Sequence, residues 1–254
     1  MKCDSEIKKV SVSIITPCLN SEDTIQDTIE SVLNQTYAPV EYIIVDGGSR
    51  DGTLDIIKKY VPLFHGRLRY VSEKDNGIYN AMNKGIRMSR GSLIGIINSD
   101  DYYETNAVEQ AVLHMGKETC QVIYGYLRII ERTGTIKYAR VEHDSLPKKM
   151  IGHPTCFVTR ETYKQCGLFL ESLRVTADYE LMLRLYRSNK VKFHLIPSVM
   201  ANFRTGGASY DIRTSMEHEL SRFIHGYGSV KEFWGACQDF MLKNDMRRKR
   251  HVNE

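Results

Sequence analysis

The sequence lacks several features that would assign it to common classes of protein. Its six cysteines form no CxxC pair, so a structural zinc site is not indicated. It has no apolar run of membrane-spanning length, and its first residues, Met-Lys-Cys-Asp-Ser-Glu, are polar, unlike a secretion signal. A net charge of +4 does not call for nucleic acid, although it suits an anionic ligand or surface. We expect a soluble cytoplasmic protein with reduced, mostly buried thiols.

Two nucleotide-binding loops are also missing. The first expected strand, residues 10–16, is followed by Thr16-Pro-Cys-Leu-Asn-Ser21, where a dinucleotide-binding protein would have GxGxxG. No GxxxxGK[ST] segment occurs either, which disfavours a P-loop NTPase. Glycines come instead after the second expected strand, in Asp46-Gly-Gly-Ser49, and a turn through Gly48 and Ser49 would bring backbone close to a nucleoside.

Strand and helix patterns alternate through the first half of the chain. β-rich runs at 10–16, 42–45, 68–71 and 93–97 are separated by helical periodicity at 25–33, 54–60 and 78–88. This alternation predicts an α/β, Rossmann-like fold with a mostly parallel central sheet and flanking helices. The second half predicts a hairpin (121–130 with 135–138), a helix (177–188), strands at 191–196 and 199–203, and C-terminal helices.

Acidic side chains follow three of the expected strands. Asp46 ends the second, Glu73 and Asp75 follow the third, and Asp100 and Asp101 follow the fourth. Because parallel strands end at one edge of a sheet, these carboxylates should gather there, at a cost unless a positive group shares the space. Mg²⁺ or Mn²⁺ is the natural partner, since such ions bridge carboxylates to phosphates.

Six motifs, in this order, resemble those of family 2 glycosyltransferases. They are Thr16-Pro17 with Asn20, VDGGSRDGT (45–53), SEKDNGIYNAMNKGI (72–86), INSDD (97–101), HPTCFVTRETY (153–163) and ADYELMLRL (177–185). The resemblance covers residues 10–204. It implies the GT-A fold and an inverting transfer from a nucleotide-activated sugar, and we expect a UDP-sugar.

The resemblance also implies roles for individual residues. Asp46 would recognise the nucleobase, Asp100 would face the ribose, and Asp101 would bind the metal that holds the diphosphate. Asp178, at the start of a helix, matches the general base, which the attacking acceptor hydroxyl requires. The remaining residues implied for the donor site are Thr16, Pro17, Asn20, Gly48, Ser49, Asp75, Asn83, Lys84 and Arg204.

Some of these residues have a second interpretation. Asn83 and Lys84 would also suit a solvated helix face, and His153 fits either the acceptor and diphosphate region or an ordinary loop. Arg204 lies beside glycines and could clamp a pyrophosphate. The chain departs from the family where relatives carry an aromatic residue, an aspartate and a glutamate, which are here Leu19, Asn98 and Ala177.

Together these features predict a metal-dependent glycosyltransferase of bacterial surface-polysaccharide synthesis, with a glycan or lipid-linked acceptor. We expect a domain at 1–205, with a donor half at about 10–115 and an acceptor half at 116–205, and a helical extension at 206–254. The basic run Arg247-Arg-Lys-Arg250 is either a solvated tail or a peripheral contact with an anionic membrane. The alternatives are a sugar nucleotidyltransferase and a catalytically silent scaffold that binds a nucleotide-sugar.

Overall fold

The computed structural model describes residues 10–206 and 213–252, with side chains as far as residue 244 in the second range. Cys3, Gly207 and the side chains of the basic run at 247–250 lie outside the described part. The strands are β1 (Val12–Cys18), β2 (Val40–Asp46), β3 (Leu68–Ser72), β4 (Leu93–Ile96), β5 (Tyr102–Tyr103), β6 (Gln121–Ile130), β7 (Ile136–Ala139), β8 (Phe157–Thr159) and β9 (Lys192–Arg204). The α-helices are α1 (Ile25–Leu33), α2 (Thr53–Tyr60), α3 (Ile78–Met88), α4 (Ala107–Leu113), α5 (Arg160–Cys166), α6 (Ala177–Arg187), α7 (Thr214–Ile224) and α8 (Val230–Val252), and short 3₁₀ turns lie at Val61–Phe64, His143–Ser145 and His153–Thr155.

One sheet runs through both halves of the chain, in the order β3-β2-β1-β4-β8-β6-β9-β5, with β7 paired to β6. The pairs among β3, β2, β1 and β4 are parallel, as the alternation of strands and helices predicts. In the second half β8 is antiparallel to both β4 and β6, while β6 and β9 are parallel. The expected α/β architecture is therefore confirmed, with a mixed sheet in the second half and the expected hairpin between β6 and β7.

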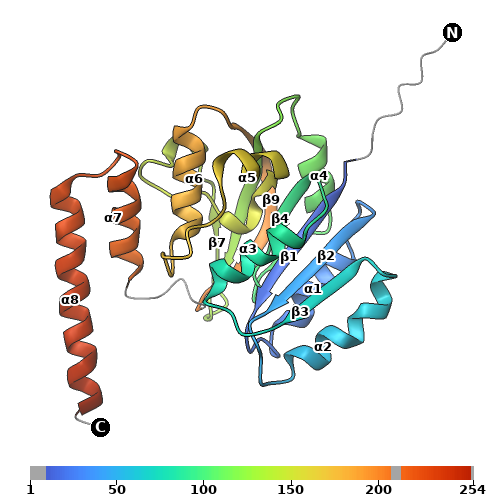
Figure 1. The fold of residues 1–254 in the computed structure, drawn as a ribbon, viewed down its shortest axis with the longest axis horizontal. Helices are drawn as coiled ribbons and strands as arrows, with labels where there is room; N and C mark the ends of the chain where they lie inside the picture. The colour runs from blue at the N-terminus through green and yellow to red at the C-terminus, as the bar shows by residue number, and fades with distance from the viewer. Residues whose placement is uncertain (1–9, 207–212, 253–254) are drawn as a thin grey trace.

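Helices cover both faces of this sheet (Figure 1). The side chains of β1 alternate between the two faces, so Ile14 joins the core beneath α1, α2 and α4, and Ile15 joins the core beneath α3 and α6. The helix α3 lies close to β1, because a Cβ built on Gly85 would come within 2.3 Å of Ile15 Cγ2. Glycine in this helix thus sets the height of α3 above the sheet.

The second half differs in detail from the sequence prediction. The expected strands at 191–196 and 199–203 form one strand, β9, whose register against β6 shifts between Ile196 and Val199. Pro197, which has no backbone N–H to offer a neighbour, falls in this irregular stretch. The sequence pattern predicted a break between two strands at Pro197. The structure instead has one strand, with an irregular pairing at the proline. The short helices α4 and α5 were not predicted, since seven residues give too little periodicity.

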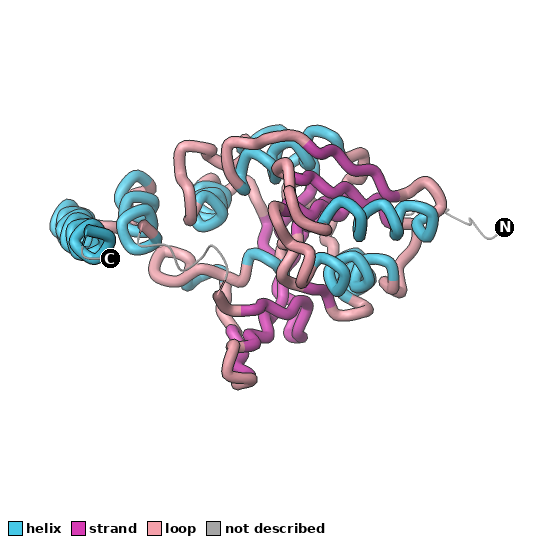
Figure 2. Tube along the Cα trace, turned by 90° about the horizontal axis from the view of Figure 1, so that it is seen from below, coloured by secondary structure: helices cyan, strands magenta, loops and turns pink. Residues whose placement is uncertain are grey.

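The C-terminal helices were predicted correctly as helical. They lie beyond α6, with α7 between α6 and α8, and Figure 2 shows α8 at the edge of the molecule. Within the described residues, no helix is both long and apolar enough to cross a bilayer.

Candidate active site

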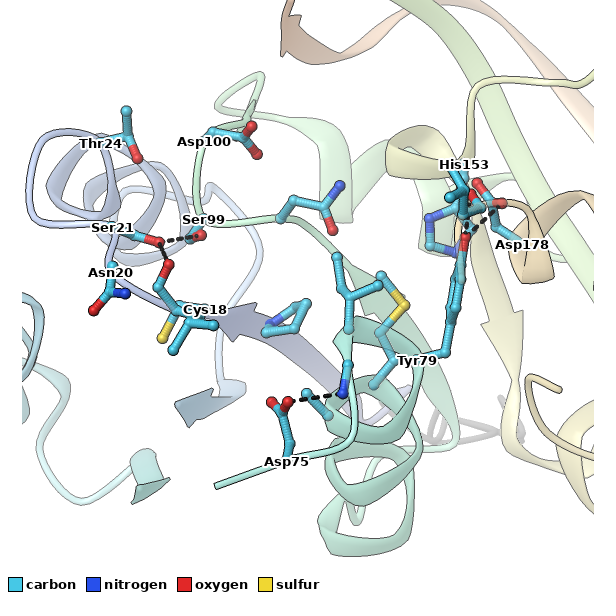
Figure 3. Close-up of a pocket in the computed structure, with 18 of the residues that line it drawn as sticks. Cys18, Asn20, Ser21, Thr24, Asp75, Tyr79, Ser99, Asp100, His153 and Asp178 are labelled. Atoms are coloured by element: carbon cyan, nitrogen blue, oxygen red, sulfur yellow. Dashed lines mark hydrogen bonds between the residues drawn. The ribbon is translucent and has the colours of Figure 1, made fainter. Parts of the chain in front are cut away.

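A cleft of about 480 Å³ opens where β1 and β4 end (Figure 3). Ligands of parallel α/β sheets bind at this edge, where the connecting loops diverge. The lining comes from the loops after β1, β3 and β4, from the start of α3, from the segment that leads into α6 and its first turn, and from single residues of β9 and of the turn at 153–155. Its members are Pro17, Cys18, Leu19, Asn20, Ser21, Asp23, Thr24, Asp75, Gly77, Ile78, Tyr79, Ala81, Met82, Asn98, Ser99, Asp100, His153, Arg174, Val175, Asp178 and Phe203.

Hydrogen bonds join the loops that form the wall of the cleft at the ends of β1 and β4. The hydroxyls of Ser21 and Ser99 lie 2.8 Å apart and tie the loop after β1 to the loop after β4. Asn20 has a positive φ of 49°, its N–H donates to Ser49 Oγ at 2.7 Å, and its Oδ1 accepts from Arg50 N at 2.9 Å. The turn after β2 therefore supports the wall from behind, and Ser49 itself is not among the lining residues.

Asp46 stabilises this turn and does not line the cleft. Its side chain is fully buried and accepts hydrogen bonds from the N–H groups of Gly48 (3.1 Å) and Ser49 (3.0 Å) and from Ser72 Oγ (2.6 Å). Gly48 has φ +88°, a conformation that glycine adopts without strain. With these partners, the carboxylate of Asp46 shapes the turn that was expected to meet the nucleobase.

The adjacent carboxylates that follow β4 have different environments. Asp100 faces the cleft, and burial raises its pKa while Arg204 partly opposes this effect. Asp101 is fully buried behind it, where its carboxylate accepts from Arg204 N at 3.0 Å and from Asn98 Nδ2 at 3.3 Å. Burial, together with the charge of Asp100, holds the pKa of Asp101 well above its ordinary value. The geometry thus presents Asp100 to a ligand rather than Asp101.

Arg204 is bound to protein groups instead of extending into the cleft. Its guanidinium pairs with Asp27 at 2.5 Å, donates to the carbonyl of Asp100 at 3.3 Å, and lies 4.9 Å from the ring centre of Tyr102. The neighbouring Phe203 is the lining residue from this segment.

Asp178 stands at the other side of the cleft, in the first turn of α6. Its Oδ1 accepts hydrogen bonds from the Tyr79 hydroxyl at 3.0 Å and from its neighbour's backbone, Tyr179 N, at 2.9 Å. The single proton of the Tyr79 hydroxyl is shared between Asp178 Oδ1 and the carbonyl of Val175, which lies 2.7 Å away. Burial, and then the charge of Asp178, raise the pKa of Tyr79 well above its ordinary value, so Tyr79 stays a donor. The Asp178 carboxylate is therefore oriented by two donors, one from α3 and one from its own helix.

His153 lines the cleft next to Asp178 (Figure 3). Burial lowers its pKa, and the charge of Asp178 only partly opposes this, so the ring is neutral at neutral pH. The ring also packs edge-on against Phe169, with 5.6 Å between centroids.

Three other residues expected at the donor site have structural contacts. Asn83 is buried and exchanges two hydrogen bonds with the backbone of Phe169, at 3.0 and 3.1 Å. Lys84 pairs with Glu73 at 2.9 Å, and the hydroxyl of Thr16 accepts from Tyr42 at 3.0 Å within the core. None of these three lines the cleft.

The structure therefore brings together six of the residues singled out in the sequence. These are Pro17, Asn20, Asp75, Asp100, His153 and Asp178. Sequence reasoning did not assign roles to two groups that the cleft contains, the Tyr79 hydroxyl and the Arg174 side chain. Tyr79 falls inside a quoted motif, whereas Arg174 lies in a loop without a recognisable pattern.

The charges of the lining bear on whether a metal ion fits. Among the described lining residues, the acids are Asp23, Asp75, Asp100 and Asp178, and Arg174 is the permanent cation. In the described part of the chain, no cluster of three or more His, Cys, Asp or Glu side chains forms a ready-made metal cage. This arrangement suits an ion such as Mg²⁺, which is held by one or two carboxylates plus substrate phosphates and waters. Asp100 is the carboxylate that fits this role.

Comparisons with known proteins agree with these features. Residues 13–173 match the family described as Glycosyl transferase family 2. The chain is 33% identical over 180 residues to chondroitin synthase of Escherichia coli, covering 68% of this chain and 26% of that protein. It is 31% identical over 196 residues to hyaluronan synthase of Pasteurella multocida, covering 74% and 20%. It thus spans only about a fifth to a quarter of these synthases.

Two further similar proteins are matched over more of their own length. The PGL/p-HBAD biosynthesis glycosyltransferase of Mycobacterium bovis is 29% identical over 205 residues, which is 79% of each chain. Among solved structures, Staphylococcus aureus TarS 1-349 in complex with UDP-GlcNAc superposes with a TM-score of 0.67 at 16% identity, over 91% of this chain and 70% of that one. This likeness supports the GT-A fold. The family match covers well over half of the residues, and the chain belongs to glycosyltransferase family 2.

Proposed function

We propose that this glycosyltransferase moves a sugar from a UDP-sugar to a hydroxyl of a glycan or lipid-linked acceptor, with inversion of the anomeric configuration. One observation carries the proposal: Asp100 and Asp178 face a single cleft from different sides. An acid placed for the diphosphate and an acid placed for the acceptor hydroxyl are the two groups that a one-step displacement needs.

In this proposal Asp178 is the general base. Its carboxylate takes the proton from the acceptor hydroxyl as the oxygen attacks the anomeric carbon. The bond between that carbon and the diphosphate oxygen breaks, the nucleoside diphosphate leaves, and the sugar is joined to the acceptor with inverted configuration. Tyr79 donates to Asp178 Oδ1 and fixes the orientation of the carboxylate. His153, neutral and buried beside the base, forms part of the acceptor side without adding a charge.

The donor half is electrostatically incomplete without a cation. A nucleoside diphosphate is anionic, and four of the lining side chains are aspartates against one arginine. Bound Mg²⁺ or Mn²⁺ would supply the charge that stabilises the leaving diphosphate. We assign Asp100 to hold that ion, in place of Asp101, because Asp101 is buried and already bonded to Arg204 N and Asn98 Nδ2. Pro17, Asn20 and Asp75 belong to the nucleoside side of the cleft.

Asp46, Gly48 and Ser49 act in this scheme through the turn they build. Asp46 holds Gly48 N and Ser49 N, and Ser49 holds Asn20. The UDP-sugar is favoured as donor because TarS, which shares the fold, has been solved in complex with UDP-GlcNAc. Relatives named for chondroitin, hyaluronan and PGL/p-HBAD synthesis support the proposal of a role in bacterial surface glycans.

We further propose that the enzyme works at the cytoplasmic face of a membrane, which it contacts through α8. Val230, Trp234 and Met241, spaced i, i+4 and i+11, form one stripe of this helix, and each is more than half exposed. The basic run at 247–250 follows in sequence, as suits an anionic surface. Sedimentation with anionic and with neutral vesicles tests this part, and Trp234→Ala should weaken binding to the anionic ones.

Calorimetric titration of UDP-, GDP- and dTDP-sugars, with and without Mn²⁺, tests the function. We expect metal-dependent binding of the UDP class by the wild type. Asp178→Asn should keep this binding and lose transfer, while Asp55→Asn, at an exposed acid of α2, should keep both. If Asp178→Asn transferred sugar at the wild-type rate, the assignment of the base would be wrong, and binding without any transfer would indicate a scaffold.

A further inference from the structure

The helix α7 contains a buried carboxylate with an unusual set of partners. Glu217 is 5% exposed and accepts hydrogen bonds from three consecutive backbone N–H groups. Arg174 N lies 3.0 Å from both carboxylate oxygens, and Val175 N and Thr176 N lie 2.8 and 3.1 Å from Oε2. Buried N–H groups need partners, and a charged acceptor gives the stronger bonds. The side chain of Glu217 therefore holds the loop formed by residues 174–176. It lies 41 to 43 residues further along the chain than that loop.

The opposite side of this loop belongs to the cleft. Val175 O accepts from Tyr79, whose hydroxyl also reaches Asp178 Oδ1. The side chain of Arg174 lines the cleft and donates to the carbonyl of Asn76. Asp178 itself follows two residues after Thr176, in the first turn of α6. The N–H groups of residues 174–176 thus face Glu217, while the side chains of Arg174 and Asp178 face the cleft.

His218 in α7 and His225 directly after it attach this helix to the first turn of α6. The ring of His218 stacks on Tyr179 with 4.2 Å between centroids and 2° between planes. The ring of His225, which follows α7, lies 3.0 Å from Glu180 Oε1. Residues 179 and 180 directly follow Asp178, so α7 and its C-cap contact the chain both before and after the proposed base. Thr176, the N-cap residue of α6, forms no side-chain cap, and its buried hydroxyl has no partner in the described part of the chain. Glu217 supplies the polar contact there instead.

We propose that Glu217 is a positioning residue for catalysis, which sets the loop at 174–176 so that Asp178 and Arg174 face the substrate. This inference rests on the proposed function of Asp178. It places α7, which follows the segment matched by the family, inside the active-site architecture. Both carboxylate oxygens take part in this role: Arg174 N lies 3.0 Å from each, and in a glutamine one of them becomes an NH₂ group that opposes this N–H donor. A displacement of the base of about 1 Å is sufficient to cost roughly 100-fold in rate.

Glu217→Gln tests the proposal with almost no change of volume. We expect kcat to fall about 10- to 100-fold, with the dissociation constant of the UDP-sugar nearly unchanged, because the donor wall is built from other loops. Glu217→Asp keeps the charge on a shorter side chain and should recover part of the loss. The matched control is Glu219→Gln on the same helix, where the carboxylate pairs with Arg222 at 2.7 Å. It should keep the wild-type kcat.

Hydrogen exchange of the amides at 174–176, followed by mass spectrometry, gives a readout that does not need activity. We expect faster exchange in Glu217→Gln and wild-type protection in Glu219→Gln. Equal exchange in wild type and Glu217→Gln would overturn the proposal, and so would faster exchange with an unchanged kcat. Equal losses of donor binding and kcat would overturn it as well, since they indicate general unfolding. A wild type without transfer would refute the proposed function, and the exchange experiment would still decide whether Glu217 orders the loop.

Discussion

Replacing Tyr79 by phenylalanine removes a single oxygen atom from the wall of the cleft. The ring stays, and it should keep its stacking against Phe169, with 5.6 Å between centroids. Two contacts disappear, the one to Asp178 Oδ1 at 3.0 Å and the one to Val175 O at 2.7 Å. The change therefore tests whether the base needs an external donor to hold its orientation.

The size of the effect follows from the hydrogen bond that is lost. A bond to a charged group contributes about 1.5–3 kcal/mol. Because about 1.4 kcal/mol corresponds to a factor of ten in rate, loss of this bond should lower kcat by roughly 10- to 150-fold. The free energy of unfolding should fall by about 1–3 kcal/mol, because Val175 O and Asp178 Oδ1 both lose a donor. The donor should bind as before, because the Tyr79 hydroxyl contacts the acceptor side.

The assay is steady-state transfer from the UDP-sugar at saturating acceptor, with donor binding measured by calorimetry and stability by urea unfolding. A suitable control is Tyr124→Phe. Tyr124 is also a buried tyrosine, but its hydroxyl bonds to His143, at 2.9 Å from Nδ1, and it does not line the cleft. This control should lose a comparable amount of stability and keep kcat.

A folded Tyr79→Phe enzyme with the wild-type kcat would refute the reasoning. It would mean that the Tyr179 N–H and the helix alone orient Asp178, or that Asp178 is not the base. A parallel loss of kcat in Tyr124→Phe would instead show that activity follows stability and not this particular hydrogen bond.

Three further changes test other parts of the structure. In calorimetry with Mn²⁺, Asp100→Asn should weaken donor binding about tenfold or more, and Asp101→Asn should weaken it less, because Asp101 is not in the cleft. Burial lowers the pKa of His153 from 6.5, so the unfolded chain takes up this proton first. The contribution of the neutral His153 ring to the free energy of unfolding is then complete above about pH 6.5 and is lost on acidification. Between about pH 7.5 and 5, the melting temperature of His153→Gln should therefore fall less than that of wild type. Gly85→Ala should cost about 1–3 kcal/mol in urea unfolding, because the new Cβ would lie 2.3 Å from Ile15 Cγ2.

Sequence patterns were most informative for regular elements with long periodicity. The helix expected at 78–88 has those bounds, and the acids after the strands do follow β2, β3 and β4. Patterns were weaker for the acceptor half, where a proline inside β9 suggested two strands. The order of the motifs was sufficient to identify the family, and it singled out Asp178 and Asp100, which both line the cleft.

The roles of neighbouring residues could not be separated in the same way. Asp100 and Asp101 have the same chemistry in the sequence, yet one lines the cleft and the other is buried behind it. Asp46 was expected to meet the nucleobase, although its oxygens are used by the turn at Gly48 and Ser49. Which face of a loop is buried depends on contacts with distant segments, such as the one that joins Asp101 to Arg204 N.

The sequence by itself determined the family, the parallel α/β half and the acids that could do chemistry, because periodicity and motif order are local properties of the chain. Only the tertiary structure decided that Tyr79 holds Asp178, that Arg174 lines the cleft, and that Glu217 fixes the loop between them. Those contacts join segments that are 41 to 99 residues apart. They depend on how α3, α6 and α7 pack together, and no local pattern of residue types specifies that packing.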